Sequence, residues 1–216
     1  MQKKNTYAVF GLGRYGSAVA RELVENGMEV LAIDASQKNV NNAAAYLPVC
    51  KCADVTDPEV IERLGIGNID TVIVCMASSL EASVMAITLC KEAGVKNVIA
   101  KCGNEMHQKI LLRVGADQVV FPENESGIRL AKNLLSSDFI DMISLSKDVS
   151  MIEIDVKEEW IGKNLIELNL RKKYGFNIVA FKKDGQVTVD INPEQILDAE
   201  TTLIVIANVA KLRKWK

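Results

Sequence analysis

A glycine-rich segment near the amino terminus has the spacing of a phosphate-binding loop. Gly11, Gly13 and Gly16 fall between an apolar stretch and a helical pattern. In this order, glycines let a chain turn tightly, approach a pyrophosphate and press a helix against a strand. The start of the helix presents unpaired amides and a positive dipole end, which favour an anion. Arg14 adds a permanent cation with a forked donor geometry, so we predict that it binds phosphate.

An acidic residue follows the glycines at the distance at which a carboxylate meets a ribose. Asp34 ends the next apolar stretch, close to the offset of about 20 residues that is typical of dinucleotide-binding folds. A carboxylate there repels a 2′-phosphate, so the predicted ligand is NAD, ATP or ADP rather than NADP. The alternative is a tight glycine turn that binds no ligand.

Further polar residues follow later apolar stretches and should gather at the same edge of a parallel sheet. Asp54 can accept from an adenine amino group or cap the helix that follows it. Residues 77–79 and Lys101 reach the same edge, although Lys101 can equally be a solvated lysine. His107, the single histidine, is either structural or part of a nucleotide or interface site. Glu123 begins a later helix, where an acidic side chain interacts favourably with the helix dipole. The alternative is that Glu123 is a metal ligand.

Apolar stretches alternate with helical patterns along the first part of the chain. This alternation predicts an α/β fold, a Rossmann-type doubly wound parallel sheet, because parallel strands need crossover helices. The expected strands are residues 7–10, 30–33, 49–52, 72–75, 98–100 and 119–121, and the expected helices are residues 17–26, 59–64, 82–93 and 105–114.

The carboxyl-terminal part has the pattern of a small α+β lobe. A helical stretch at residues 123–135 ends where the periodicity breaks, at residues 136–138. We predict a nucleotide-binding domain at residues 1–122, a linker of crossover helices for dimerisation at 123–145, and a carboxyl-terminal domain at 146–216. About 70 residues make a small core, which favours dimerisation. Strands are expected at residues 151–156, 176–181, 187–191 and 203–207.

Composition argues against several classes of protein. The 216-residue chain is 49% hydrophobic with a formal charge of −2, so nucleic acid is not an expected partner. No apolar run approaches the about 20 residues that cross a bilayer, and no secretion signal precedes the first strand. We therefore expect a cytoplasmic chain that does not insert into a membrane. The carboxyl-terminal part contains no histidine or cysteine, so we predict that the chain is not an enzyme.

Four motifs occur together along this chain. The sequence VFGLGRYGS occupies residues 9–17, ADVT residues 53–56, GAD residues 115–117 and FPE residues 121–123. In this combination the chain resembles the cytosolic gating subunits of Ktr/Trk-type potassium transporters, which are built from regulator-of-potassium-conductance (RCK) domains. Many relatives have Gly-Asp where this chain has Ala53-Asp54, but the acid is retained.

The resemblance implies a first lobe that binds ATP or ADP and a second lobe of the TrkA-C type. The implied nucleotide-site residues are Gly11, Gly13, Arg14, Tyr15, Gly16, Asp34, Ala35, Ser36, Asp54, Val55, Met76, Ala77, Ser78, Lys101, Cys102, Gly103 and His107. It also implies that Glu123 helps to hold a divalent cation. A second ligand, cyclic di-AMP, is implied at Leu165, Ile166, Arg171, Phe176, Asn177, Ile178 and Pro193. Ordinary packing of the lobe is the alternative for this second set.

The resemblance also implies partners. Homodimers would assemble into a ring, expected to be an octamer, beneath a membrane potassium-translocating subunit of the KtrB or TrkH type. The nucleotide would then control the pore. The runner-up is a small NAD-dependent oxidoreductase or an NAD(H)-sensing protein, and the ligand that binds most tightly distinguishes the two classes.

Overall fold

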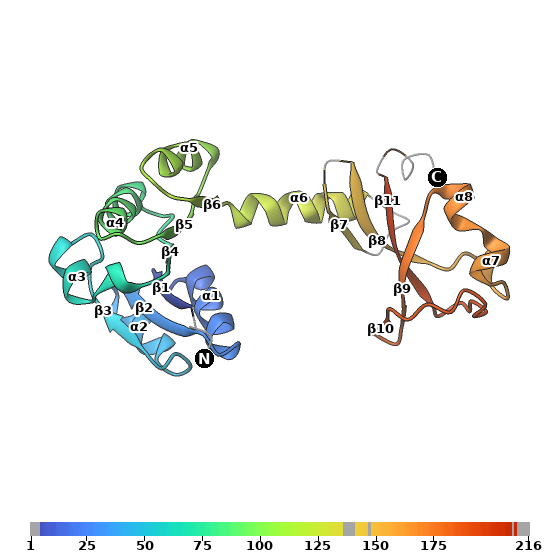
Figure 1. The fold of residues 1–216 in the computed structure, drawn as a ribbon, viewed down its shortest axis with the longest axis horizontal. Helices are drawn as coiled ribbons and strands as arrows, with labels where there is room; N and C mark the ends of the chain where they lie inside the picture. Colours follow the sequence, from blue (N-terminus) through green and yellow to red (C-terminus); the bar gives the residue numbers. More distant parts are fainter. Residues whose placement is uncertain (1–4, 136–140, 147, 209, 211–216) are drawn as a thin grey trace. The chain divides into compact units, whose positions relative to one another are not determined.

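The computed structural model describes residues 5–135, 141–146, 148–208 and 210 (Figure 1). The chain divides into two compact units, Met1–Glu123 and Asn124–Lys216, and each has a sheet of its own. The expected break in periodicity at residues 136–138 lies outside the described residues. The predicted bounds of 1–122, 123–145 and 146–216 stay predictions.

The first unit is built on a six-stranded parallel sheet in the order β3-β2-β1-β4-β5-β6. The order turns back between β1 and β4, so the carboxyl ends of these two strands flank the point at which such sheets bind ligands. The predicted doubly wound sheet is confirmed. Its strands are β1 (Thr6–Phe10), β2 (Glu29–Asp34), β3 (Cys50–Cys52), β4 (Thr71–Val74), β5 (Asn97–Lys101) and β6 (Gln118–Val120).

Helices cover both faces of this sheet. In β1, Ala8 and Phe10 enter one buried cluster while Val9 enters the other, because successive side chains of a strand point to opposite faces. The first cluster includes residues of α3, α4 and α5, and the second includes residues of α1 and α2. The helices are α1 (Arg14–Glu25), α2 (Gln37–Ala43), α3 (Pro58–Arg63), α4 (Leu80–Glu92) and α5 (Glu105–Arg113), with a 3₁₀ turn η1 (Ile66–Asn68). The helix α6 (Pro122–Leu135) follows.

The helix α2 is absent from the expected helices. Asn39, Asn41 and Asn42 lie within its seven residues, and asparagine has a weak helix propensity because its side chain competes for backbone hydrogen bonds. Only Val40 and Ala43 of this helix are buried. Tertiary packing of these two apolar residues therefore outweighs a poor local preference.

The second unit is an antiparallel sheet of five strands in the order β10-β9-β11-β8-β7. One face carries the lobe's core, which includes Trp160, Phe176 and Leu203, and the α+β prediction is confirmed. The strands are β7 (Asp141–Ser144), β8 (Val149–Asp155), β9 (Asn177–Lys183), β10 (Gln186–Thr188) and β11 (Thr202–Asn208), and the helical segments are η2 (Glu158–Trp160), α7 (Leu165–Leu168) and α8 (Leu170–Tyr174).

Two details of the second unit differ from the predictions. Residues 141–144, which fall within the predicted linker of helices, form β7 and pair with β8. The expected strand at residues 187–191 pairs only over Gln186–Thr188. Its later residues leave the sheet before Pro193, which cannot donate to a ladder.

Candidate nucleotide site

The glycine-rich loop connects β1 to α1 and requires glycine at two positions. Gly11 has φ +91°, and a Cβ there would lie 3.1 Å from Met76 Cγ. A Cβ on Gly16 would lie 1.9 Å from the Gly11 carbonyl oxygen, so helix and loop could not approach as they do. Gly13 differs, because a Cβ there would meet nothing within 4 Å. The tight turn and the close helix contact are thus confirmed, and open space remains beside Gly13.

Asp34 ends β2 and ties three segments together. Its Oδ2 accepts from Leu12 N at 2.6 Å and from Asn39 Nδ2 at 3.1 Å, and its Oδ1 accepts from Ser36 N at 2.7 Å. The carboxylate therefore joins the glycine loop to the start of α2. This contact between residues 22 apart brings the predicted ribose acid beside the predicted phosphate loop.

A cavity of about 500 Å³ lies at this edge of the first sheet. Its volume is within the range of small-molecule sites, about 300 to 1,000 Å³. Predicted nucleotide-site residues that line it are Gly11, Gly13, Asp34, Ala35, Asp54, Val55, Met76 and Ser78. Ser79, which the sequence placed at the same edge, also lines it. Lining residues that were not predicted to bind the nucleotide are Ile33, Asn39, Ala53, Thr56, Cys75 and Ala82. The cavity thus joins the loops that follow β1, β2, β3 and β4.

Asp54 lines the cavity on the β3 side and is fixed by Thr56. Its Oδ1 accepts from Thr56 N at 2.9 Å and from Thr56 Oγ1 at 2.7 Å. These two bonds hold the pKa of the Asp54 carboxyl below its usual value, and the bond from the Thr56 backbone has the larger effect. The residue that caps α3 is Asp57, whose side chain accepts from Glu59 N. The alternative interpretation of Asp54 as the helix cap is therefore wrong.

Cys75 lines the same cavity at the end of β4. Burial raises the pKa of its thiol to about 12. The group therefore stays protonated near neutral pH, and a protonated thiol is a poor nucleophile. Cys75 contributes a small apolar wall to the cavity rather than a reactive group.

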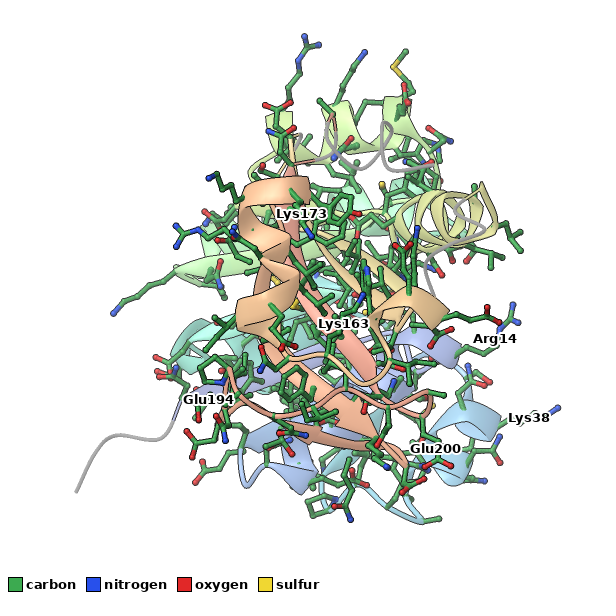
Figure 2. All side chains as sticks on the ribbon, turned by 90° about the vertical axis from the view of Figure 1, so that its right-hand side faces the viewer. Arg14, Lys38, Lys163, Lys173, Glu194 and Glu200 are labelled. Atoms are coloured by element: carbon green, nitrogen blue, oxygen red, sulfur yellow. The ribbon has the colours of Figure 1, made fainter. Side chains whose placement is uncertain are left out.

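A second polar group lies at the first turns of α1 and α6. Lys101 Nζ forms an ion pair with Glu123 Oε1 at 2.5 Å and lies 5.5 Å from the centre of the Tyr15 ring. The hydrogen bond from Lys101 holds the pKa of the Glu123 carboxyl below its usual value, and the charge of Arg14 adds to the effect. Arg14 is exposed and extends away from the ribbon (Figure 2).

The remaining predicted residues do not line the cavity. Gly103 approaches the β4–α4 loop, since a Cβ there would lie 3.4 Å from the Ala77 carbonyl oxygen. Cys102 is fully buried, and His107 N donates to the Asn104 side chain that caps α5. The residues placed outside the cavity lining are Arg14, Tyr15, Gly16, Ser36, Ala77, Lys101, Cys102, Gly103 and His107.

No group of three or more His, Cys, Asp or Glu side chains that could hold a metal ion occurs among the described residues. The cation site at Glu123 stays a prediction.

A smaller cavity of about 240 Å³ lies in the second unit, between α7, α8 and the start of β9. Its lining includes the predicted residues Leu165, Arg171, Phe176, Asn177 and Ile178, together with Asn169 and Leu170. Pro193 is adjacent, because its carbonyl oxygen accepts from Leu165 N at 3.1 Å, whereas the Ile166 side chain is exposed. The structure thus brings most of this predicted set together around one hollow.

The first unit is a Rossmann-type domain with the geometry of a nucleotide site, and an antiparallel lobe follows it. Residues 7–122 match the TrkA-N domain, and residues 149–215 match the TrkA-C domain. The Ktr system potassium uptake protein C of Bacillus subtilis (strain 168) is 36% identical over 213 residues, which cover 99% of this chain and 96% of that protein. The chain therefore belongs to the family of Ktr potassium uptake proteins with TrkA-N and TrkA-C domains, as its motifs predicted.

Solved channel structures share the fold. The GsuK channel bound to NAD matches 98% of this chain with a TM-score of 0.65 and 17% identity, and the match covers 38% of that chain. A structure of GsuK bound to ADP matches 64% of this chain with a TM-score of 0.54 and 16% identity, over 36% of that chain. In the part of the present chain that the structure describes, no helix is long and apolar enough to cross a membrane.

Proposed function

We propose that this chain is a regulatory subunit of a potassium uptake system and senses ATP and ADP through its first unit. The observation that carries the proposal is the cavity that joins Gly11 and Gly13 to Asp34 and Asp54. It combines a loop suited to phosphate, an acid suited to ribose and a second acid suited to an adenine amino group. Membership of the Ktr family supports the link to potassium uptake.

In this proposal, homodimers assemble into a ring, expected to be an octamer, on the cytoplasmic side of a KtrB- or TrkH-like pore subunit. ATP and ADP favour different shapes of the ring, and the pore responds to the shape. Arg14 is suited to read the γ-phosphate because it is exposed at the start of α1. A divalent cation held by Glu123 would first have to displace the Lys101 ammonium that now pairs with it.

Co-expression with the membrane proteins encoded beside it tests the potassium assignment. A potassium-translocating membrane protein should be retained on the purified chain, and potassium flux in vesicles that contain both should be higher with ATP than with ADP. Glu123→Gln should reduce the effect of divalent cations on this difference. Equal flux at saturating concentrations of both nucleotides would rule out the gating mechanism and leave nucleotide binding intact.

NADH is the second candidate ligand, and with it the class of NAD-dependent oxidoreductases or NAD(H) sensors. The GsuK channel with the same fold is described as bound to NAD, and Asp34 suits any unphosphorylated ribose. We expect ATP and ADP to bind more tightly than NADH, because a charged phosphate tail suits Arg14 better than a nicotinamide does. Calorimetry that gives the tightest binding for NADH, together with hydride transfer, would favour the oxidoreductase.

We further propose that the cavity of the second unit binds cyclic di-AMP. Its lining pairs a cation, Arg171, and a polar amide, Asn177, with the apolar surface of Phe176 and Ile178, which suits phosphates and purines. Equilibrium dialysis with the first site saturated by ATP should show cyclic di-AMP binding. Arg171→Ala should weaken it by about 1.5 to 3 kcal/mol, the range of a charge-assisted hydrogen bond. Unchanged binding by this variant would exclude the cavity.

A further inference from the structure

Asp34, the predicted ribose acid, already accepts three hydrogen bonds from the protein. The donors are Leu12 N and Asn39 Nδ2 on Oδ2 and Ser36 N on Oδ1. An ionised carboxylate offers about four lone-pair positions. One position therefore remains, and two ribose hydroxyls cannot both donate to this carboxylate unless a protein donor leaves.

The three protein donors differ in how firmly they are held. Leu12 N belongs to the glycine loop, and Ser36 N closes the turn that leads into α2. Both are backbone groups whose position is set by the turns around them. Asn39 reaches Asp34 through a side chain, and its bond of 3.1 Å is the longest of the three. Of the three donors, Asn39 is therefore the one that can adjust most easily to a bound ribose.

Asn39 also lines the cavity and is partly buried. Because a carboxylate only accepts hydrogen bonds, the Asn39 amino group must face Asp34. The carbonyl oxygen of the amide is then an acceptor, and no hydrogen bond among the described residues goes to it. Lys38, the preceding residue, is exposed and extends away from the ribbon (Figure 2). The residue of α2 that faces the ribose acid is thus neutral.

We propose that Asn39 determines ribose specificity: Asp34 accepts one ribose hydroxyl at its remaining position, and the Asn39 carbonyl oxygen accepts the other. The inference rests on the proposed nucleotide binding and applies to ATP, ADP and NADH alike, since all contain an adenosine ribose. A neutral amide beside a carboxylate offers no charge to a 2′-phosphate. The pair therefore also excludes phosphorylated riboses.

Calorimetry with ADP, 2′-deoxy-ADP and 3′-deoxy-ADP tests this assignment. Asn39→Ala is compared with Asn41→Ala, a matched control on the same helix whose exposed side chain bonds Gln37 at 2.8 Å. Asn39→Ala should weaken ADP binding by about 2- to 12-fold, the range of one neutral hydrogen bond. It should leave unchanged the binding of the deoxynucleotide that lacks the hydroxyl accepted by Asn39. Asn41→Ala should bind all three like the wild type.

Other outcomes would overturn the inference. An equal loss for all three nucleotides in Asn39→Ala would mean that Asn39 acts only by holding Asp34. The same affinities in Asn39→Ala and Asn41→Ala would mean that Asn39 has no role in the site. Asn39→Leu, which is close to asparagine in volume, repeats the measurement if the alanine variant fails to fold. If the wild type binds none of ATP, ADP and NADH, the proposed function itself fails, which is a separate result.

Discussion

Gly13 caps the start of α1 and Gly16 lies within this helix. Replacing each by alanine should have a different effect. At Gly16, a Cβ would lie 1.9 Å from the Gly11 carbonyl oxygen, whereas real Cβ contacts are essentially never under 3.0 Å. The loop and α1 must therefore separate by about 1.1 Å, the difference between these two distances. The loop is held by Gly11 N bonding Ile33 O at 2.8 Å, and α1 by the buried Ala20. Overpacking of this kind costs about 1 to 3 kcal/mol.

Gly13→Ala should instead spare stability and harm binding. Its φ of −70° suits alanine, and a Cβ would meet no protein atom within 4 Å. Alanine has fewer conformations than glycine in the unfolded chain, which stabilises the folded protein by about 0.4 to 1 kcal/mol. Alanine is also a poorer N-cap than glycine, which destabilises the helix by a similar amount. The two effects nearly cancel. The added methyl group occupies the space proposed for phosphate. Overpacking costs about 1 to 3 kcal/mol, so ADP binding should weaken roughly 5- to 150-fold.

Urea unfolding and ADP calorimetry on the two variants separate these effects. Gly16→Ala should lower the free energy of unfolding by about 1 to 3 kcal/mol, and Gly13→Ala should not. A folded Gly13→Ala protein that binds ADP like the wild type would refute the placement of the phosphates beside this loop. A Gly16→Ala protein of unchanged stability would refute the steric argument for the helix contact.

Other predictions concern charge. Arg14→Ala should weaken ATP more than ADP, by about 1.5 to 3 kcal/mol for ATP, and leave adenosine binding nearly unchanged; calorimetry with intact affinities would place the phosphates elsewhere. The hydrogen bond from Lys183, the largest cause, together with one from Thr201 lowers the pKa of Asp198 from 3.8 to about 2. The stabilisation from the ionised carboxylate is therefore present above 3.8 and is lost as the pH falls through about 2. Lys183→Met should therefore be less stable than the wild type near neutral pH, and urea unfolding curves should converge in acid. A difference that persists below about pH 2 would contradict this pairing.

The sequence predicted those parts of the site that local pattern determines. The spacing of Gly11 and Gly16 implied a tight turn and a close helix contact, and both follow from local sterics. The offset of Asp34 implied proximity to the loop because a strand, a helix and a second strand have nearly constant length in this fold. The alternation of Ala8, Val9 and Phe10 between two cores follows from the period of a strand.

Several side-chain contacts at the site were not predictable from the local sequence pattern. Lys101 and Glu123 are 22 residues apart and pair because β5 ends near the start of α6, but neither residue type indicates the other. Asn39 lies on a helix with weak propensity, so its bond to Asp34 had no local signal. The Asp54–Thr56 contact differs, because the acceptance of the Thr56 N–H by Asp54 Oδ1 is a local Asx-type turn that spans two residues.

The proposed gating requires several sites to act together, which favours a ring over a single dimer. A ligand shifts an equilibrium only by its differential affinity for the two states. The γ-phosphate is the difference between ATP and ADP, and a tenfold preference that it creates near Arg14 is worth about 1.4 kcal/mol per site. Moving a two-state equilibrium from 1:99 to 99:1 takes about 5.5 kcal/mol. Two sites would supply about 2.8 kcal/mol, which is too little, whereas four or more would supply about 5.6 kcal/mol or more. A modest preference at each exposed arginine is therefore enough to open or close a pore only when the subunits of a larger assembly change shape together.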